Sequence, residues 1–353
     1  MISVAEGGHD RSVRLKPGSV AIAVACLLLS MMIAVAMGAV SLPLGGIARE
    51  LVDRLPFVHV SSGLSDREVA ILWELRMPRV VLGALVGASL SMSGAAYQGV
   101  FRNALADPYL LGAAAGAGLG ATLVFAYITD AASWPIDPLP LAAFVGALVS
   151  VLLTYALGRS GGRERSATTL ILAGVAMASF LTAVQTYFQQ RESDTLQQVY
   201  AWILGRLSTS GWREVGLILP YVVVSGVGIL MHRRLLDVLS VGDEEADSLG
   251  IKASRVRLIV VVAATLATAA AVAVSGLIGF VGIIVPHTIR LLFGSSYRSV
   301  LPLSILFGAS FLILADLFAR TISAPAELPI GVITAFFGAP FFIVVLRSSR
   351  RMS

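Results

Sequence analysis

Long uncharged apolar runs are the feature that most restricts how this chain can fold. The first run covers residues 17–48 and follows Arg11, Arg14 and Lys16. A helix crosses a bilayer with about 20 mostly apolar residues, whereas the apolar core of a signal peptide has about 7–15. We therefore expect a retained first membrane helix. Only 13% of the 353 residues are charged, against about 25% in soluble domains, which predicts a membrane protein throughout.

The chain contains ten candidate membrane spans. They are residues 18–40, 77–100, 109–128, 139–158, 168–188, 214–231, 256–275, 277–293, 300–318 and 328–346. The stretch 258–289 is the hardest to divide, because its 32 residues carry no charge apart from His287. As one helix it would be about 48 Å long, well beyond a hydrocarbon core of about 30 Å. Gly276, Gly279 and Pro286 offer breaks, so we expect two helices joined by a tight turn.

The distribution of basic residues tests this division, because cytoplasmic loops of membrane proteins carry an excess of Lys and Arg. With ten helices and a cytoplasmic N-terminus, 17 of the 26 basic residues fall inside and 9 outside. A single helix over 258–293 would give 13 on each side. We therefore predict a single transmembrane domain over residues 1–353 with both termini in the cytoplasm. Its parts outside the spans are a cytoplasmic tail at 1–17, a cytoplasmic loop at 232–257, and external segments at 41–76 and 189–213. The same asymmetry explains the net charge of +5 without nucleic acid as a partner.

The cytoplasmic loop contains the polar sequence LSVGDEEADSLGIKASRVR at 239–257. Four acidic residues fall within five positions of it: Asp243, Glu244, Glu245 and Asp247. Acidic residues favour a helix N-terminus and a basic residue such as Lys252 favours the C-terminal side. The pattern predicts short helices along the membrane surface, with a solvated loop as the alternative.

The external segment 189–213 contains an apolar run at 195–205 that is too short to cross a bilayer. We expect a re-entrant or interfacial helix there, with Trp202 and Trp212 near the lipid headgroups.

Sequence motifs for catalysis are absent. The chain has no G-x-x-x-x-G-K-[ST], so it is not itself an ATPase of the P-loop kind, and it has no H-E-x-x-H or clustered Cys and His for a metal enzyme. Cys26 is the only cysteine, which excludes an internal disulfide. Ion-coupled carriers use carboxylates within the membrane, but Asp316 and Glu327 lie at helix ends. His287 is either a functional group or a packed side chain bonded to carbonyls that Pro286 leaves free. A transporter of this kind would take its energy from another subunit.

Several segments resemble the FecCD-type permeases, the membrane subunits of ATP-driven importers for ferric siderophores, haem and cobalamin. The resemblance covers nearly the whole chain after about residue 20, in the family's order. Its segments are ELRMPRVVLGALVGASLSMSGAAYQGVFRNALADPYLLGAAAGAG (74–118), LILAGVA (170–176), WILGRLSTSGW (202–212), VGDEEADSLG (241–250), SGLIGFVGIIVPHTIR (275–290) and ADLFARTISAPAELPIGVITAFFGAPFF (315–342).

The resemblance implies an all-α polytopic membrane protein with ten transmembrane helices per subunit, the type II ABC importer permease fold. It implies a dimer with a second copy or a close paralogue, set in membrane lipid. Two separate ATP-binding-cassette ATPase subunits would bind on the cytoplasmic face and use ATP and Mg. A substrate-binding protein would dock outside. This chain would then bind no cofactor or metal and carry no catalytic residue.

The resemblance also assigns roles by position. The residues that match the ATPase-coupling segment are Gly242, Asp243, Glu244, Glu245, Ala246, Asp247, Leu249 and Gly250. In this interpretation Gly242, Ala246 and Gly250 allow close approach, while the acids supply caps and polar contacts.

Two further sets of residues follow in the same way. Arg76, Arg79 and Arg320 match arginines that meet acidic residues of the binding protein, with snorkelling to the membrane interface as the alternative. Asn103, Leu105 and Thr168 match the cytoplasmic gate, although Ala104 stands where the family commonly has proline. Tyr97 and Gln98 are candidates either for lining the substrate path or for packing.

We therefore expect a permease subunit of an ATP-driven importer in the cytoplasmic membrane that moves an iron chelate such as a ferric siderophore. Haem and cobalamin are the alternatives within the family. A stand-alone ion-coupled carrier is the alternative from another class of protein.

Overall fold

The computed structural model describes residues 15–38, 42–54, 59–128, 130, 134–160, 167–207 and 211–349. Within these ranges the regular structure is helical. In chain order the helices are α1 (Pro17–Ala36), α2 (Leu44–Asp53), α3 (Asp66–Ala70), the π-helix η1 (Ile71–Arg76), α4 (Met77–Phe101), α5 (Ala113–Tyr127), α6 (Pro138–Ser160), α7 (Ala167–Arg191), the 3-10 helix η3 (Ser193–Thr195), α8 (Leu196–Ile203), α9 (Arg213–Met231), α10 (Arg233–Val241), α11 (Asp243–Ser248), α12 (Ala253–Ser275), α13 (Val281–Phe293), α14 (Tyr297–Thr321) and α15 (Ile330–Ser349).

Ten of these helical segments account for the ten predicted spans. In the described part of the chain, seven are long and apolar enough to cross a membrane, and three shorter apolar ones are Ala113–Tyr127, Val281–Phe293 and Ile330–Val345. The division of 258–293 into two helices is confirmed, because α12 ends at Ser275 and α13 begins at Val281. Gly276 and Phe280, which flank the break, both have positive φ values of 69° and 68°, so the helix does not continue through them.

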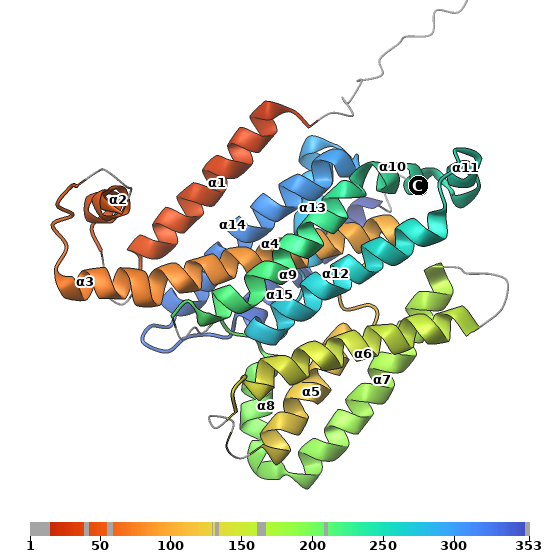
Figure 1. Cartoon of the computed structure of the whole chain (residues 1–353), viewed down its shortest axis with the longest axis horizontal. Coiled ribbons are helices and arrows are strands. Elements are labelled where there is room, and N and C mark those ends of the chain that lie inside the picture. Colours follow the sequence, from red (N-terminus) through yellow and green to blue (C-terminus); the bar gives the residue numbers. More distant parts are fainter. Residues whose placement is uncertain are drawn as a thin grey trace, which may run out of the picture.

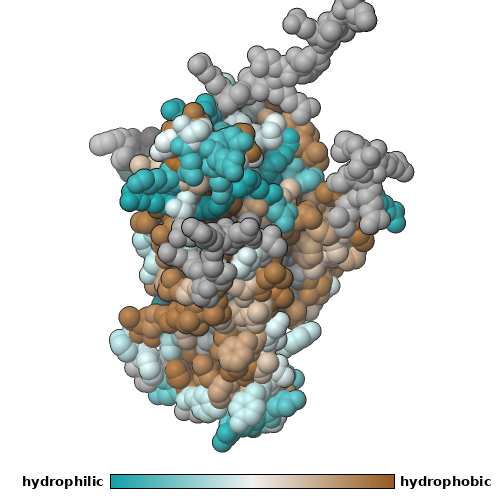
Figure 2. Space-filling model, turned by 90° about the vertical axis from the view of Figure 1, so that its right-hand side faces the viewer, coloured by the Kyte–Doolittle hydropathy of each residue, from teal (hydrophilic) through white to brown (hydrophobic). Residues whose placement is uncertain are grey.

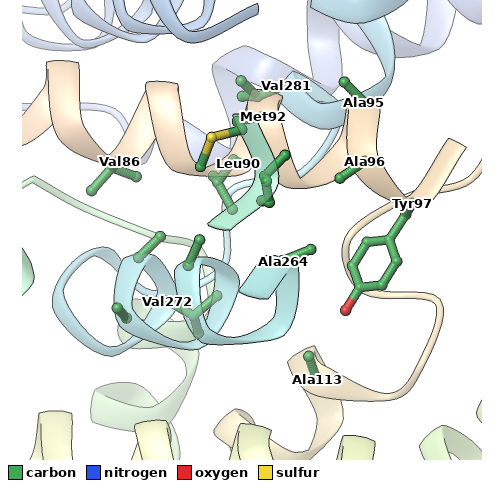
Figure 3. Packing of buried hydrophobic residues seen from close by; sticks show 14 of the residues in the cluster. Val86, Leu90, Met92, Ala95, Ala96, Tyr97, Ala113, Ala264, Val272 and Val281 are labelled. Atoms are coloured by element: carbon green, nitrogen blue, oxygen red, sulfur yellow. The ribbon is translucent and has the colours of Figure 1, made fainter. Parts of the chain in front are cut away.

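Helix α4 runs through the middle of the bundle and is buried along most of its length. It packs against α14, α12, α13 and α9, and Figure 3 shows Leu90 among the side chains between α4 and α12. Small residues set the distances: a Cβ at Gly94 would lie 2.1 Å from the carbonyl oxygen of Gly282. Backbones that approach this closely gain dispersion contacts, which drive helix association where lipid removes the hydrophobic effect.

Helices α5 to α8 form a group on one side of the bundle, where α6 and α5 contact α12 (Figure 1). Glycines again permit the contact inside the group, since a Cβ at Gly116 of α5 would lie 2.2 Å from the carbonyl oxygen of Gly146 of α6. The face of α7 that points away from α5 and α6 carries exposed apolar side chains such as Leu172 and Phe180. The group therefore attaches to the rest of the chain mainly through α12.

Two spans are shorter than a bilayer core. α5 has 15 residues and α13 has 13, which correspond to about 22 Å and 20 Å. The predicted span 109–128 therefore began too early. The carboxylate of Asp107 accepts a hydrogen bond of 2.8 Å from the backbone N–H of Tyr109, and Gly112 has a φ of 81°. An Asx turn and a left-handed glycine hold 102–112 out of the helix.

The short helix expected within 195–205 is present as α8, and the two tryptophans expected near the lipid headgroups, Trp202 in α8 and Trp212 before α9, differ in exposure. Trp202 is 6% exposed and belongs to the buried core, because α8 packs against α5. Trp212 is 44% exposed, and its indole N–H donates to the carbonyl of Trp73 at 3.0 Å. Only Trp212 is therefore available to lipid headgroups.

The two ends of the bundle differ in their side chains. Arg79 lies in the first turn of α4, and Arg102 follows the last residue of this 25-residue helix, about 34 Å further along its axis. We call these the Arg79 end and the α11 end, since α11 lies beside Arg102. Figure 2 looks onto the α11 end, where hydrophilic surface gathers in the upper half and hydrophobic surface lies below it.

Candidate functional site

Residues 232–257 lie at the α11 end and are mostly helical, in α10, α11 and the start of α12, so the solvated-loop alternative does not describe them. α10 lies across the ends of α4 and α14, and it buries Leu236 and Leu239 completely. α11 follows after Gly242 and begins with three acidic residues in its first turn, as the charge pattern predicted. Acidic side chains there favour the positive end of the helix dipole. The two helices form an amphipathic pair on the surface of the bundle (Figure 1).

Most of the predicted coupling residues face outward. Glu244, Glu245, Asp247, Leu249 and Gly250 are exposed, with Leu249 68% exposed. Gly250 has a φ of 76°, which suits the turn after α11.

Two predicted coupling residues face inward instead. Gly242 and Ala246 are buried against the chain itself, so they present no surface to a partner in this conformation. Val241 is 70% exposed beside Gly242, and the sequence analysis missed it. The only signal for Val241 in the sequence was an apolar residue at an outward position of an otherwise polar helix pair.

Asp243 joins α11 to the end of α4 and the start of α12. One carboxylate oxygen accepts from Arg102 at 2.5 Å and from Arg257 at 2.5 Å, and the other accepts from Arg257 at 2.8 Å. Arg102 has a φ of 50°, a left-handed conformation that costs free energy in a residue other than glycine. The ion pair helps to hold Arg102 in that conformation, and α11 is therefore linked directly to the residue that opens segment 102–112.

Two of the three predicted gate residues, Asn103 and Leu105, lie in this segment. The side-chain oxygen of Asn103 accepts a hydrogen bond of 2.9 Å from the backbone N–H of Leu105, so a turn forms here with Ala104 in place of proline. Leu105 is half-buried and Asn103 is exposed. Thr168 lies in the first turn of α7, and its side chain falls outside the described residues. The structure thus places Asn103 one residue and Leu105 three residues after Arg102, which pairs with Asp243.

Buried polar contacts fix segment 102–112 to the interior. Gln98 is 1% exposed, and its amide N–H donates to the carbonyls of Ala106 at 3.3 Å and Gly282 at 3.0 Å. The Tyr109 hydroxyl donates to the carbonyl of Ile278 at 3.1 Å and accepts from its N–H at 3.2 Å. These bonds satisfy non-helical backbone, which is tolerated at membrane depth only when protein covers it.

Tyr97 and Gln98 therefore pack in the core of this chain. The hydroxyl of Tyr97 lies 2.7 Å from that of Thr265 on α12, and Tyr97 is 1% exposed. Figure 3 shows its ring between α4 and α12.

At the opposite end, Arg79 is held by two carboxylates of its own chain. It donates to Asp316 at 2.9–3.2 Å and to Glu327 at 2.9 Å on both carboxylate oxygens. Asp316 is buried, with its side chain 4% exposed, whereas the side chain of Glu327 is 53% exposed. The two hydrogen bonds from Arg79 lower the pKa of Glu327 below its ordinary value. Topology placed these acids on the same side as the arginines, but sequence could not pair residues 237 and 248 positions apart.

Arg76 and Arg320 cap the C-terminal end of α1. Arg76 donates to the carbonyls of Val35 at 2.6 Å and Ala36 at 3.0 Å, and Arg320 donates to that of Ala34. The last carbonyls of a helix lack intrahelical partners and carry partial negative charge, so cations stabilise them. The three arginines thus lie on one end of the bundle, as predicted, and each is engaged by this chain.

Other candidate groups are unremarkable in their contacts. His287 packs edge-on against the ring of Phe341, with centroids 5.7 Å apart. Cys26 is exposed on α1. The described residues contain no group of three or more His, Cys, Asp or Glu side chains that could hold a metal ion.

In the described part of the chain, ten apolar helices, with α4 buried among the other nine, and an amphipathic helix pair at one end define a multi-pass membrane protein. The chain matches the FecCD transport family over residues 26–348 and belongs to that family. It is therefore the membrane component of an ABC transporter.

Known relatives and a solved structure agree with this assignment. The chain is 42% identical over 284 residues to the uncharacterized ABC transporter permease protein YvrB of Bacillus subtilis, covering 80% of each chain. It is 42% identical to the cobalamin import system permease protein BtuC of Halobacterium salinarum, covering 81% of this chain and 75% of that one. It is 37% identical to the Fe(3+)-citrate import system permease protein YfmD of Bacillus subtilis, covering 88% and 91%. A metal-chelate type ABC transporter solved in an inward-facing conformation superposes with a TM-score of 0.81 at 26% identity, covering 94% of this chain and all of that chain.

Proposed function

We propose that this permease imports an iron chelate such as a ferric siderophore across the cytoplasmic membrane, using ATP hydrolysed by separate subunits. The observation that carries the proposal is the exposed surface of α11, tied through Asp243 to Arg102 and the adjoining segment 102–112. The Arg102–Asp243 ion pair therefore joins the surface that would contact an ATPase directly to the segment that would close the path.

The orientation follows from the distribution of charge. The ten-helix topology gives the α11 side 17 of the 26 basic residues, which favours the cytoplasm for that end and for both termini. The Arg79 end then faces outward.

The ATPase subunits would bind at α11. Leu249 and Val241 are apolar side chains that α10 and α11 leave in water, and the exposed acids Glu244 and Asp247 flank them. Apolar anchors surrounded by polar residues are the usual anatomy of a protein interface. Two ATPase subunits, one for each copy of the permease, would use ATP and Mg while this chain binds neither.

A second copy of the chain, or a close paralogue, would complete the path. Ser179, Thr182 and Thr186 lie on the exposed face of α7, where two of their hydroxyls donate to carbonyls one turn earlier. A polar stripe on an otherwise apolar outward face suits a path between two subunits better than lipid.

The binding protein would dock at the Arg79 end. Arg79 already has two carboxylate partners in its own chain, and Glu327 is the exposed one. A carboxylate of the binding protein would therefore exchange with Glu327. Arg76 and Arg320, which cap α1, would act by holding the end of that helix in place.

The chelate is inferred from relatives named for iron chelates. Besides the ferric citrate permease, a probable iron chelatin permease of Helicobacter pylori is 37% identical to this chain. Haem and cobalamin are the alternatives, through the hemin permease HmuU of Yersinia pestis at 37% identity and BtuC of Halobacterium salinarum at 42%.

Uptake by the complete complex tests the substrate. Permease, ATPase and binding protein are reconstituted in proteoliposomes and offered radiolabelled ferric siderophore, haem or cobalamin at equal concentration. We expect the ferric siderophore to accumulate. If only haem or cobalamin accumulates, that compound is the substrate in place of the ferric siderophore, and the assignment as an ATP-driven importer holds.

A further inference from the structure

A pocket of about 210 Å³ opens at the α11 end between α4, α6, α7 and α12. Its inner wall is apolar, and its rim is polar where α12 begins. The wall includes Val100, Leu170, Leu258 and Val261, and the rim includes Ser254, Arg255 and Arg257. None of these residues has a role in the transport mechanism proposed above except Arg257, which also holds Asp243.

The two arginines of the rim have donors to spare. Arg255 is exposed, and among the described residues its guanidinium group makes no hydrogen bond or ion pair. Arg257 uses two nitrogens for Asp243, while its Nε is buried and lacks an acceptor in the described part of the chain. Guanidinium groups with unmet donors match phosphate oxygens in charge and in planar geometry.

The beginning of α12 adds to this preference for an anion. α12 has 23 residues; in its first turn the N–H groups of Arg255 and Val256 donate to the carbonyl of Lys252, whereas those of Ala253 and Ser254 have no partner among the described residues. Such a terminus attracts phosphate through these donors and through the helix dipole. The exposed hydroxyl of Ser254 lies in the same turn.

Along the membrane normal the pocket changes from a polar rim at the membrane surface to an apolar wall deeper in, the same order as in a phospholipid. α12 enters the bilayer from Ala253, so Arg255 lies near the surface, with Leu258 about one turn deeper and Val261 about two. A cationic rim therefore stands over an apolar groove, in the leaflet where basic pockets between membrane helices bind anionic headgroups.

We propose that this pocket binds an anionic phospholipid, with its phosphate on Arg255 and Arg257 and an acyl chain along Leu258 and Val261. The proposal depends on the orientation that puts α11 in the cytoplasm, and it is independent of the substrate. Because Arg257 contacts both the phosphate and Asp243, the bound lipid would brace the start of α12 against α11.

Native mass spectrometry of the purified permease with defined lipids tests the site. The protein is titrated with phosphatidylglycerol or phosphatidylcholine, and the fraction that retains one lipid is measured. We expect retention of phosphatidylglycerol only. Arg255→Gln should weaken it about fivefold, which corresponds to about 1 kcal/mol for one cation near an anionic surface. Leu258→Trp, which fills the groove without changing charge, should weaken it as well.

A matched control and a second probe make the outcome decisive. Arg234→Gln removes an exposed arginine of α10 at the same end and should leave retention unchanged. Equal retention in Arg255→Gln and Arg234→Gln, or equal retention of both lipids, would overturn the proposal. Displacement of phosphatidylglycerol by millimolar inorganic phosphate, together with wild-type retention in Leu258→Trp, would assign the rim to free phosphate and also overturn it.

Discussion

The strongest single prediction concerns Asp316 at the Arg79 end. Its side chain is 4% exposed, and the nearest nitrogens of Arg79 and Arg320 lie 2.9 Å and 3.7 Å away. Asp316→Ala leaves both guanidinium groups without their buried partner, and losing one side of a buried ion pair costs about 3–5 kcal/mol. Glu327 keeps two hydrogen bonds to Arg79 but is 53% exposed, so it offsets only part of the loss. We expect the free energy of unfolding to fall by about 2–4 kcal/mol.

Thermal unfolding in detergent, followed by the fluorescence of the four tryptophans, measures this effect. Arg67→Ala is the control, because Arg67 is an exposed cation near the same end and its loss should change the unfolding free energy by less than about 0.5 kcal/mol. The double variant Arg79→Ala with Asp316→Ala should lose less than the sum of the single variants. An unfolding midpoint for Asp316→Ala equal to that of wild type would refute the structural role, and so would an equal drop in Arg67→Ala.

Four further outcomes follow from the site. Leu249→Asp should abolish stimulation of the ATPase by the permease while leaving the unfolding midpoint unchanged, since Leu249 is 68% exposed; normal stimulation would remove α11 from the interface. Leu105→Ala should raise nucleotide-independent leak of substrate from proteoliposomes, and an unchanged leak would count against the gate. Because the pKa of Glu327 is lowered by Arg79, its stabilising contribution is complete above the pKa of unfolded Glu, about 4.3, and is lost as pH falls below that value. Glu327→Gln should therefore flatten the acid limb of unfolding midpoint against pH, whereas an identical limb would contradict the pairing. The same variant frees Arg79 and should tighten docking of the binding protein, measured by surface plasmon resonance; weaker docking would assign Glu327 itself to the interface.

The architecture was largely predictable because lipid imposes simple rules on sequence. Apolar length, glycine breaks and basic loops predicted ten spans, the interruption after Ser275 and the helices around Asp243. The features that the sequence analysis missed depend on local polar contacts and on packing between helices. The Asx turn at Asp107 delays the start of α5, and packing against α5 buries Trp202; neither contact follows from the pattern of apolar residues.

The pairing of charges could not be predicted, because it depends on how distant helices pack. Arg79 meets carboxylates that are 237 and 248 positions away, and Arg102 meets Asp243 across 141 positions. The motif resemblance selected residues at both ends of the bundle, and their roles in coupling, gating and docking stay predictions. It did not indicate that Arg79 is already neutralised within the chain, nor that Asp243 bonds to the end of α4. Those partners become visible only when α4, α12 and α14 are assembled.

The source of energy is the most direct test of the central claim, that α11 couples this permease to a separate ATPase. Uptake of ferric chelate is measured in proteoliposomes that contain the permease with or without its ATPase, in the presence of binding protein. Ionophores collapse the proton and sodium gradients in parallel samples. The account predicts uptake that requires ATP and the ATPase subunit and that is unchanged by the ionophores. Uptake by the permease alone, driven by a gradient and abolished by the ionophores, would contradict it and establish an ion-coupled carrier.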